Sequence, residues 1–163
     1  MRTSVLVILA AATLAAAAPV SAQSVKHLQN SNPGGIADGV WAGDTLYLSG
    51  QLPSPSKPAD RAANTPAVWG TTTEQADSAF QKIQTLLKAQ GLGMGDVVMM
   101  RVYMAADPAM GNKIDFAGMN AAYARFFGTK EQPNKPARST FQVAALVAQG
   151  ALLEVEVQAA RSK

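Results

Sequence analysis

The sequence contains no cysteine and only one histidine in its 163 residues. Without cysteine the chain can form no disulfide, no thiolate metal site and no thiol nucleophile. The single histidine, His27, lies in a polar stretch, and one imidazole without clustered carboxylates makes a poor metal site. It also leaves Ser-His and Cys-His catalysis by one chain without support. We therefore expect no metal and no cofactor, and stability that comes from packing and association.

Strong charge of either sign and long apolar runs are also missing from most of the chain. Charged residues make up 15% of the sequence, with 14 Lys and Arg against 11 Asp and Glu. The basic residues are scattered rather than gathered into a stripe, so we expect no nucleic acid partner. Beyond residue 22, no apolar run reaches the roughly 20 residues that a membrane-spanning helix needs.

The first 22 residues have the pattern of a secretory signal peptide. Arg2 gives a short positive region, Val5 to Ala18 form a small and apolar run, and Pro19 to Ala22 resemble a cleavage site. A membrane anchor is the alternative, but the run is too short for it. We expect a periplasmic or secreted protein whose residues 23–163 form a single domain without membrane contact.

Hydrophobic periodicity predicts strands that alternate with helices. The two helices carry apolar side chains at spacings of three and four. Gln75 follows Thr72 by three residues, a spacing that could close a capping box at the start of the first helix. Two stretches, 23–33 and 53–69, are expected to be an irregular lead-in and a long surface loop. The predicted order is strand 39–42, strand 45–49, a helix from a cap at Thr72 or Thr73 to about residue 89, strand 96–104, helix 114–127, strand 135–143 and strand 152–160.

This order of elements predicts an α+β or α/β domain. Two helices can cover only one face of such a sheet. The other face carries apolar residues from several strands, so we expect it to be buried by self-association.

Arg138 is the most informative polar residue of the chain. Pro136 can begin a strand, which holds the guanidinium near the strand's start, and a guanidinium can bind a carboxylate through two parallel hydrogen bonds. An ordinary surface arginine is the alternative. Glu154 and Glu156 share one face of the last strand, and they lie either on a solvated face or beside Arg138. A hairpin of the last two strands would instead place Arg138 opposite residues 156 and 157, so the pattern leaves this open.

Four segments occur in an order that resembles the Rid family of YjgF-type enamine and imine deaminases. They are Leu48 to Pro53, Met119 to Phe127, Pro136-Ala137-Arg138-Ser139 and Leu153 to Val157. The resemblance extends from about Asn32 to Ala160. It implies a chorismate-mutase-like α+β fold with a mixed sheet, two helices on one face, and a homotrimer whose active sites lie in clefts between subunits.

The resemblance also implies roles for individual residues. Arg138 would hold the substrate carboxylate, and Glu154, matched after a one-residue gap, would position the hydrolytic water. Ser49 and Gly50 match the family's Ser-Gly at the site, and Asn120 matches its helix asparagine.

Two further positions differ from the family pattern. Thr140 stands where a cysteine is usual, and its backbone would help to hold the bound carboxylate or water. Ile36 lies where the deaminases usually carry a tyrosine.

The implied reaction is hydrolysis of a 2-imino acid, in equilibrium with its enamine, to a 2-keto acid and ammonia. An iminium carbon is already electrophilic, so the reaction needs neither a metal nor a covalent nucleophile. One alternative, which Ile36 favours, is a non-catalytic module that binds a small carboxylate on the same trimer. Another is a holdase-like interaction protein, which would need a large exposed apolar surface.

Overall fold

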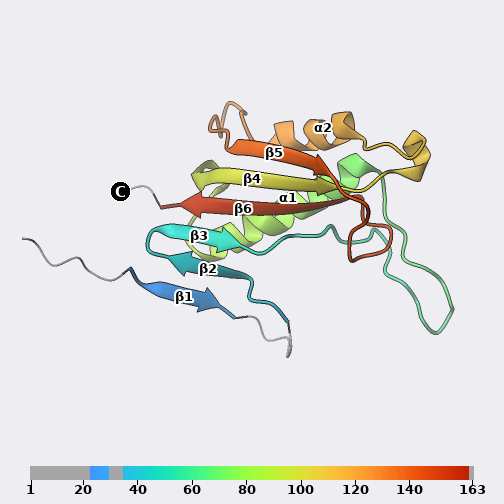
Figure 1. The fold of residues 1–163 in the computed structure, drawn as a ribbon, viewed down its shortest axis with the longest axis horizontal. Helices are drawn as coiled ribbons and strands as arrows, with labels where there is room; N and C mark the ends of the chain where they lie inside the picture. Colours follow the sequence, from blue (N-terminus) through green and yellow to red (C-terminus); the bar gives the residue numbers. More distant parts are fainter. Residues whose placement is uncertain (1–22, 30–34, 162–163) are drawn as a thin grey trace, which may run out of the picture.

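The computed structural model describes residues 23–29 and 35–161, so the predicted signal peptide lies outside the described residues. The described chain forms one six-stranded sheet with both long helices on the same face (Figure 1). The predicted α+β fold with a mixed sheet is confirmed. The elements are β1 Val25–Leu28, β2 Gly39–Ala42, β3 Thr45–Leu48, α1 Thr72–Ala89, β4 Val97–Met104, α2 Phe116–Phe126, β5 Ala137–Gln142 and β6 Leu153–Ala160, with short 3₁₀ turns at Met94–Asp96 and Pro108–Met110.

The strand order is β1-β2-β3-β6-β4-β5, and only the β4–β5 pair is parallel. Parallel neighbours need a crossover connection, which α2 supplies here. β6 lies between β3 and β4, near the middle of the sheet, and β5 lies at its edge. The two last strands are therefore separated by β4, and the hairpin considered from the sequence does not form.

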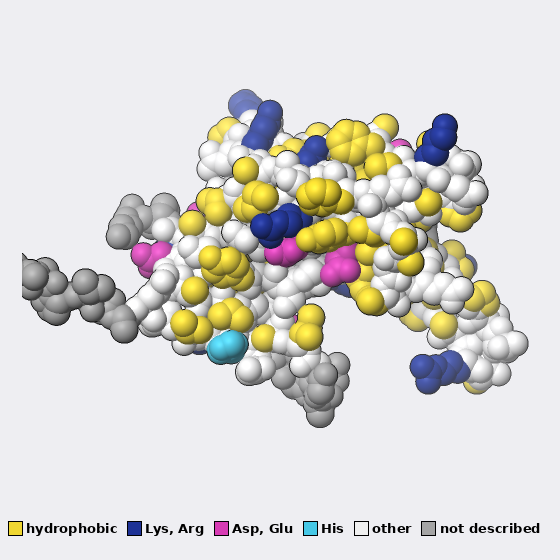
Figure 2. Space-filling view, viewed as in Figure 1, with side chains coloured by type: hydrophobic (Ala, Val, Ile, Leu, Met, Phe, Trp, Pro, Cys, Tyr) yellow, Lys and Arg dark blue, Asp and Glu magenta, His cyan; other side chains and the backbone are white. Residues whose placement is uncertain are grey.

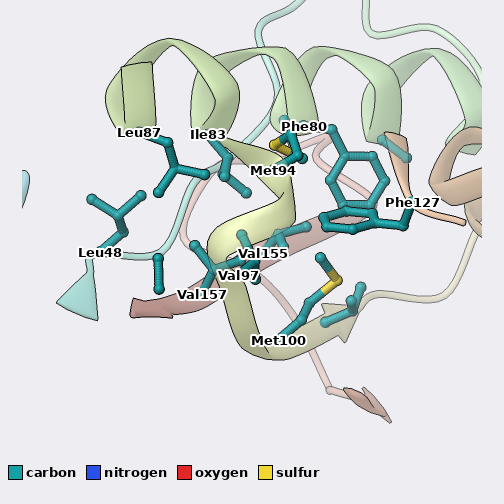
Figure 3. Close-up of a cluster of buried hydrophobic side chains, with 14 of the residues drawn as sticks. Leu48, Phe80, Ile83, Leu87, Met94, Val97, Met100, Phe127, Val155 and Val157 are labelled. Atoms are coloured by element: carbon teal, nitrogen blue, oxygen red, sulfur yellow. The ribbon is translucent and has the colours of Figure 1, made fainter. Parts of the chain in front are cut away.

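The core lies between the sheet and α1. Phe80, Ile83 and Leu87 extend from one side of α1 at helical spacing, and they meet Val155 and Val157 from β6 (Figure 3). All five side chains are almost fully buried. Because side chains alternate along a strand, this burial directs the even-numbered residues of β6 to the face that the helices leave open.

The start of α1 differs by one residue from the prediction. Thr71 is the N-cap, and its side chain and Glu74 form the capping box, rather than Thr72 and Gln75. The Thr72 hydroxyl turns instead toward Asp107, and the Gln75 amide group accepts a hydrogen bond from the Leu152 N–H at 2.9 Å. The Thr72 and Gln75 side chains are both buried and make tertiary contacts, so the exposed Thr71 and Glu74 form the cap instead.

The predicted irregular lead-in is partly wrong. Within residues 23–29, Val25–Leu28 form β1, an edge strand that pairs with β2. Three of its four residues are exposed, so the sequence has no hydrophobic period here from which a strand could be predicted. The loop between β3 and α1 lacks regular elements as predicted, although Lys57 bridges to Val68 and Asp60 to Thr65. Among the described helices, none combines the length and the apolar character needed to cross a membrane.

Candidate functional site

Arg138 lies on β5 beneath the start of α2. Its Nη2 donates a hydrogen bond to Asn120 Oδ1 at 2.8 Å, and its Nη1 is 3.8 Å from the sulfur of Met119. The guanidinium carbon lies 4.4 Å from the centre of the Tyr123 ring and 5.8 Å from that of Phe116. Residues spaced by three and four share one side of a helix, so α2 presents this whole group to a single arginine.

The group around Arg138 suits a bound carboxylate. A guanidinium has five N–H donors, so it can hold the Asn120 oxygen and a carboxylate at the same time. The aromatic face of Tyr123 attracts the cation without neutralising it. Burial raises the pKa of the Tyr123 hydroxyl, although the nearby Arg138 cation opposes that rise, so this ring remains uncharged at neutral pH.

Glu154 lies on β6 against Gly50. A Cβ atom on Gly50 would be 1.9 Å from Glu154 Oε1, which is far closer than any real contact. Beside them Gln51 and Val155 exchange backbone hydrogen bonds of 2.8 and 3.1 Å, which fixes the Gly50 backbone beside the carboxylate. Only a residue without a side chain permits this approach.

Ser49 and Ile36 lie next to this second group. The Ser49 hydroxyl donates a 2.6 Å hydrogen bond to the carbonyl of Ala37, the residue that follows Ile36. Ile36 itself is 73% exposed. Ser49, Gly50 and Glu154 therefore form one group, with Ile36 at its border.

The two groups lie on opposite faces of the sheet. The strand register aligns Arg138 with Met100 on β4 and Val157 on β6, and both of these side chains are buried under the helices. Glu154 aligns with Tyr103, three residues further along, and so it faces away from the helices. One chain does not bring the Arg138 guanidinium and the Glu154 carboxylate together. Thr140, two residues beyond Arg138, shares the face of Arg138 and is half-buried.

The other glutamate of β6, Glu156, has a different partner. Its carboxylate accepts hydrogen bonds from Arg101 Nη1 at 2.8 Å and from the Tyr103 hydroxyl at 3.2 Å. Burial and the neighbouring Glu156 charge raise the pKa of Tyr103. Phe141 stacks on the Tyr103 ring with centroids 6.1 Å apart. Figure 2 shows this helix-free face, where hydrophobic side chains surround acidic and basic ones.

Tyr123 and Phe116 were not identified as site residues from the sequence. Their apolar period predicted only a core-facing side of the second helix. Their spacing from Asn120 could have identified them. Phe116 precedes Asn120 by four residues and Tyr123 follows it by three, which places all three on one side of the helix. Within 23–29 and 35–161, no three His, Asp or Glu side chains come together in a way that could hold a metal ion.

Comparisons with known proteins agree with this fold. The family model described as endoribonuclease L-PSP matches residues 33–161. A RutC family protein of Saccharolobus solfataricus is 33% identical over 129 residues, which is 79% of this chain and 89% of that protein. The 2-iminobutanoate/2-iminopropanoate deaminase of Salmonella typhimurium is 32% identical over 128 residues, covering 78% of this chain and 88% of that one.

A solved structure is also similar. Escherichia coli TdcF with bound serine superposes with a TM-score of 0.61 at 29% identity, covering 79% of this chain and 90% of that one. The matched region contains every described element from β2 to β6. The chain therefore belongs to the endoribonuclease L-PSP family, which is the Rid or YjgF family that its motifs resemble.

Proposed function

We propose that this protein hydrolyses reactive 2-imino acids, in equilibrium with their enamines, to 2-keto acids and ammonia. The observation that carries the proposal is the Arg138 guanidinium, held by Asn120 and backed by Tyr123 in an arrangement suited to a small carboxylate. Membership of a family that includes a named 2-iminobutanoate/2-iminopropanoate deaminase supports it.

Each group has one task in the reaction. Arg138 binds the carboxylate of the imino acid and thereby orients the iminium carbon. Glu154 takes a proton from a water molecule as its oxygen forms a bond to that carbon. Glu154 then returns its proton to the nitrogen of the resulting carbinolamine. The C–N bond breaks to release ammonia and the hydroxyl proton is lost, which leaves the keto acid. The backbone around Ser49 and Thr140 helps to hold the water and the carboxylate.

We propose further that the site is completed between subunits of a homotrimer. Arg138 and Glu154 point to opposite faces of one sheet, so a second copy must supply one of them. The helix-free face carries Tyr47 and Phe141, which are 44% and 48% exposed in the single chain. Burying these rings against a neighbouring subunit would remove apolar surface from water on the face that the helices leave exposed.

Ile36 is proposed to tune the substrate rather than to react. It lies at the border of the Ser49 group and places an apolar side chain where the usual tyrosine would offer a hydroxyl. An apolar wall favours imines with larger aliphatic side chains over 2-iminopropanoate.

Residues 1–22 are proposed to be a signal peptide, which would place the mature protein in the periplasm or outside the cell. N-terminal sequencing of protein recovered from an envelope fraction tests this directly. A mature chain that begins at Gln23 is expected, whereas an intact Met1 would contradict it.

Keto-acid release from freshly generated imines tests the reaction. We expect the protein to accelerate hydrolysis of 2-iminopropanoate and of the leucine-derived imine over the spontaneous rate. Arg138→Ala should lower kcat/KM by more than about tenfold, because a charge-assisted pair is lost. Arg125→Ala is the matched control, since it removes a helix arginine that pairs with Asp77 on α1 instead.

No acceleration with either imine would contradict the deaminase proposal. In that case, retention of pyruvate by the wild type but not by Arg138→Ala would establish a carboxylate-binding module. Suppression of the aggregation of an unfolded client by the protein would indicate the holdase-like role.

A further inference from the structure

A second cleft lies between α1 and the two segments that flank the β2–β3 hairpin. Its volume is about 500 Å³, within the range of roughly 300–1,000 Å³ typical of small-molecule sites. We call it the α1 cleft. The lining residues that matter here are Asp38, Gln51, Ser78, Lys82, Thr85 and Leu86.

The α1 cleft is separate from both groups of the proposed deaminase site. Neither Arg138 nor Glu154 lines it, and α2 contributes no residue to it. Gln51 pairs with Val155, whose side chain is buried on the helix face, whereas Glu154 lies on the other face. A ligand in this cleft would therefore contact neither the guanidinium nor the catalytic carboxylate.

Lys82 supplies a positioned cation to the cleft. Its Nζ donates a 2.8 Å hydrogen bond to the carbonyl of Leu52, which holds the half-buried side chain in place. An ammonium group has three donors, so two remain for a ligand. Burial lowers the pKa of Lys82, which indicates that its charge is only partly hydrated and gains from an anionic partner.

The remaining lining is polar and carries one opposite charge. Ser78 Oγ accepts the N–H of Ser54 at 2.9 Å, so its hydroxyl proton can still be donated. A carboxylate has about four lone-pair positions, so Asp38 can accept a further donor in addition to its contacts within the protein. Leu86 gives the cleft one apolar wall.

A ligand that complements this lining carries both charges and an apolar portion. We propose that the α1 cleft binds a free α-amino acid. Its carboxylate contacts Lys82, its ammonium group contacts Asp38, and its side chain packs against Leu86. Among the described lining residues, one acid and one base balance each other and leave no excess charge to attract a simple anion or cation.

Calorimetric titration of the purified protein with L-leucine tests the proposal, because two analogues each lack one charge. Leucinamide has no carboxylate, and 4-methylpentanoate has no ammonium group. We expect L-leucine to bind and each analogue to bind about tenfold more weakly or worse, since each loses a charge-assisted hydrogen bond.

Variants then locate the binding. Lys82→Met should weaken L-leucine binding about tenfold, whereas Lys88→Met, which removes an exposed lysine of the same helix, should not. Thr85→Phe should block the cleft and keep the described contacts between elements, because the hydrogen bond that the structure gives the Thr85 hydroxyl lies within α1, to the Gln81 carbonyl. Arg138→Ala should leave binding unchanged, so this test is independent of the deaminase proposal.

Three results would overturn the inference. They are the absence of L-leucine binding at millimolar concentration, equal binding of 4-methylpentanoate, and loss of binding in Arg138→Ala with retention in both Lys82→Met and Thr85→Phe. The last result would assign the amino acid to the Arg138 group.

Discussion

Arg138 is held from two sides before a ligand arrives. Asn120 bonds one edge of the guanidinium and the Tyr123 ring supports its plane. A long, flexible side chain that is already ordered loses less entropy on binding, which strengthens the complex. In the proposed reaction Tyr123 is therefore a positioning residue, which would act on the substrate through Arg138.

Replacement of Tyr123 tests this role. Tyr123→Leu should raise KM for the imino acid, or Kd for pyruvate, about 3- to 30-fold, because a cation–π contact of about 0.5–2 kcal/mol is removed. Tyr123→Phe keeps the ring face and should change KM less than about twofold. If both variants behave alike in KM while melting normally, the ring does not position the guanidinium.

Gly50 permits an experiment on Glu154 without changing the carboxylate itself. In Gly50→Ala the new methyl group would collide with Glu154 Oε1, so the carboxylate must move. We expect kcat to fall about 10- to 100-fold, because general-base catalysis depends on hydrogen-bond geometry, while pyruvate binding is retained.

Gly93→Ala is the matched control for Gly50→Ala. Its nearest neighbour to an added methyl group is 3.9 Å away, which is ordinary contact. Steady-state kinetics of the three proteins with one imine provides the comparison. Unchanged kcat in Gly50→Ala would remove the support for Glu154 as the base.

At the scale of the elements, the exposed capping box determines how well α1 begins. Thr71→Ala should lower the free energy of unfolding by about 1 kcal/mol, the usual loss for an N-cap threonine. Thr85→Ala, also an exposed threonine of this helix region, should be neutral or slightly stabilising because alanine favours helix. Urea denaturation at neutral pH measures both, and equal effects would argue against the cap at Thr71.

The same capping box predicts that the free energy of unfolding depends on pH in the acid range. Hydrogen bonds from the Thr71 backbone and side chain lower the pKa of Glu74 below its usual 4.5. The ionised carboxylate therefore stabilises the fold above pH 4.5, and this contribution is lost as the pH falls through the lower folded-state pKa. The difference in unfolding free energy between wild type and Glu74→Gln should shrink as the pH falls below 4.5 and through the folded-state pKa. A difference that stays constant under acid conditions would contradict the assignment.

Much of the element order was predictable because it depends on local pattern. The hairpin of β2 and β3, both long helices and the three later strands all have clear periods or turn residues. β1 escaped prediction because an exposed edge strand has no hydrophobic period.

The relative placement of Arg138 and Glu154 depends on a different kind of information. It follows from the insertion of β4 between β5 and β6, which fixes the register and therefore the face of each side chain. Such pairing between distant segments leaves no mark in either strand's own sequence. The motifs could identify both residues, but only the sheet topology shows that they face apart.

At the scale of the whole molecule, the two halves of the proposed site can be separated genetically. Arg138→Ala and Glu154→Gln should each be inactive alone. If a neighbour supplies one residue, subunits mixed in equal amounts and reassembled should regain about a quarter of the activity, since one interface in four receives both intact residues. No recovery in verified mixed oligomers would show that one subunit must carry both.

The central position of β6 has a consequence for the order in which this protein can be made. β6 is the last of the described strands to be synthesised, yet it pairs with both β3 and β4. Until it emerges from the ribosome, the strands β1 to β3 and the pair β4–β5 are two half-sheets with unpaired edges. The complete sheet therefore cannot form before β6 has been synthesised. Chains truncated before β6 should expose two strand edges and become substrates for chaperones or proteases.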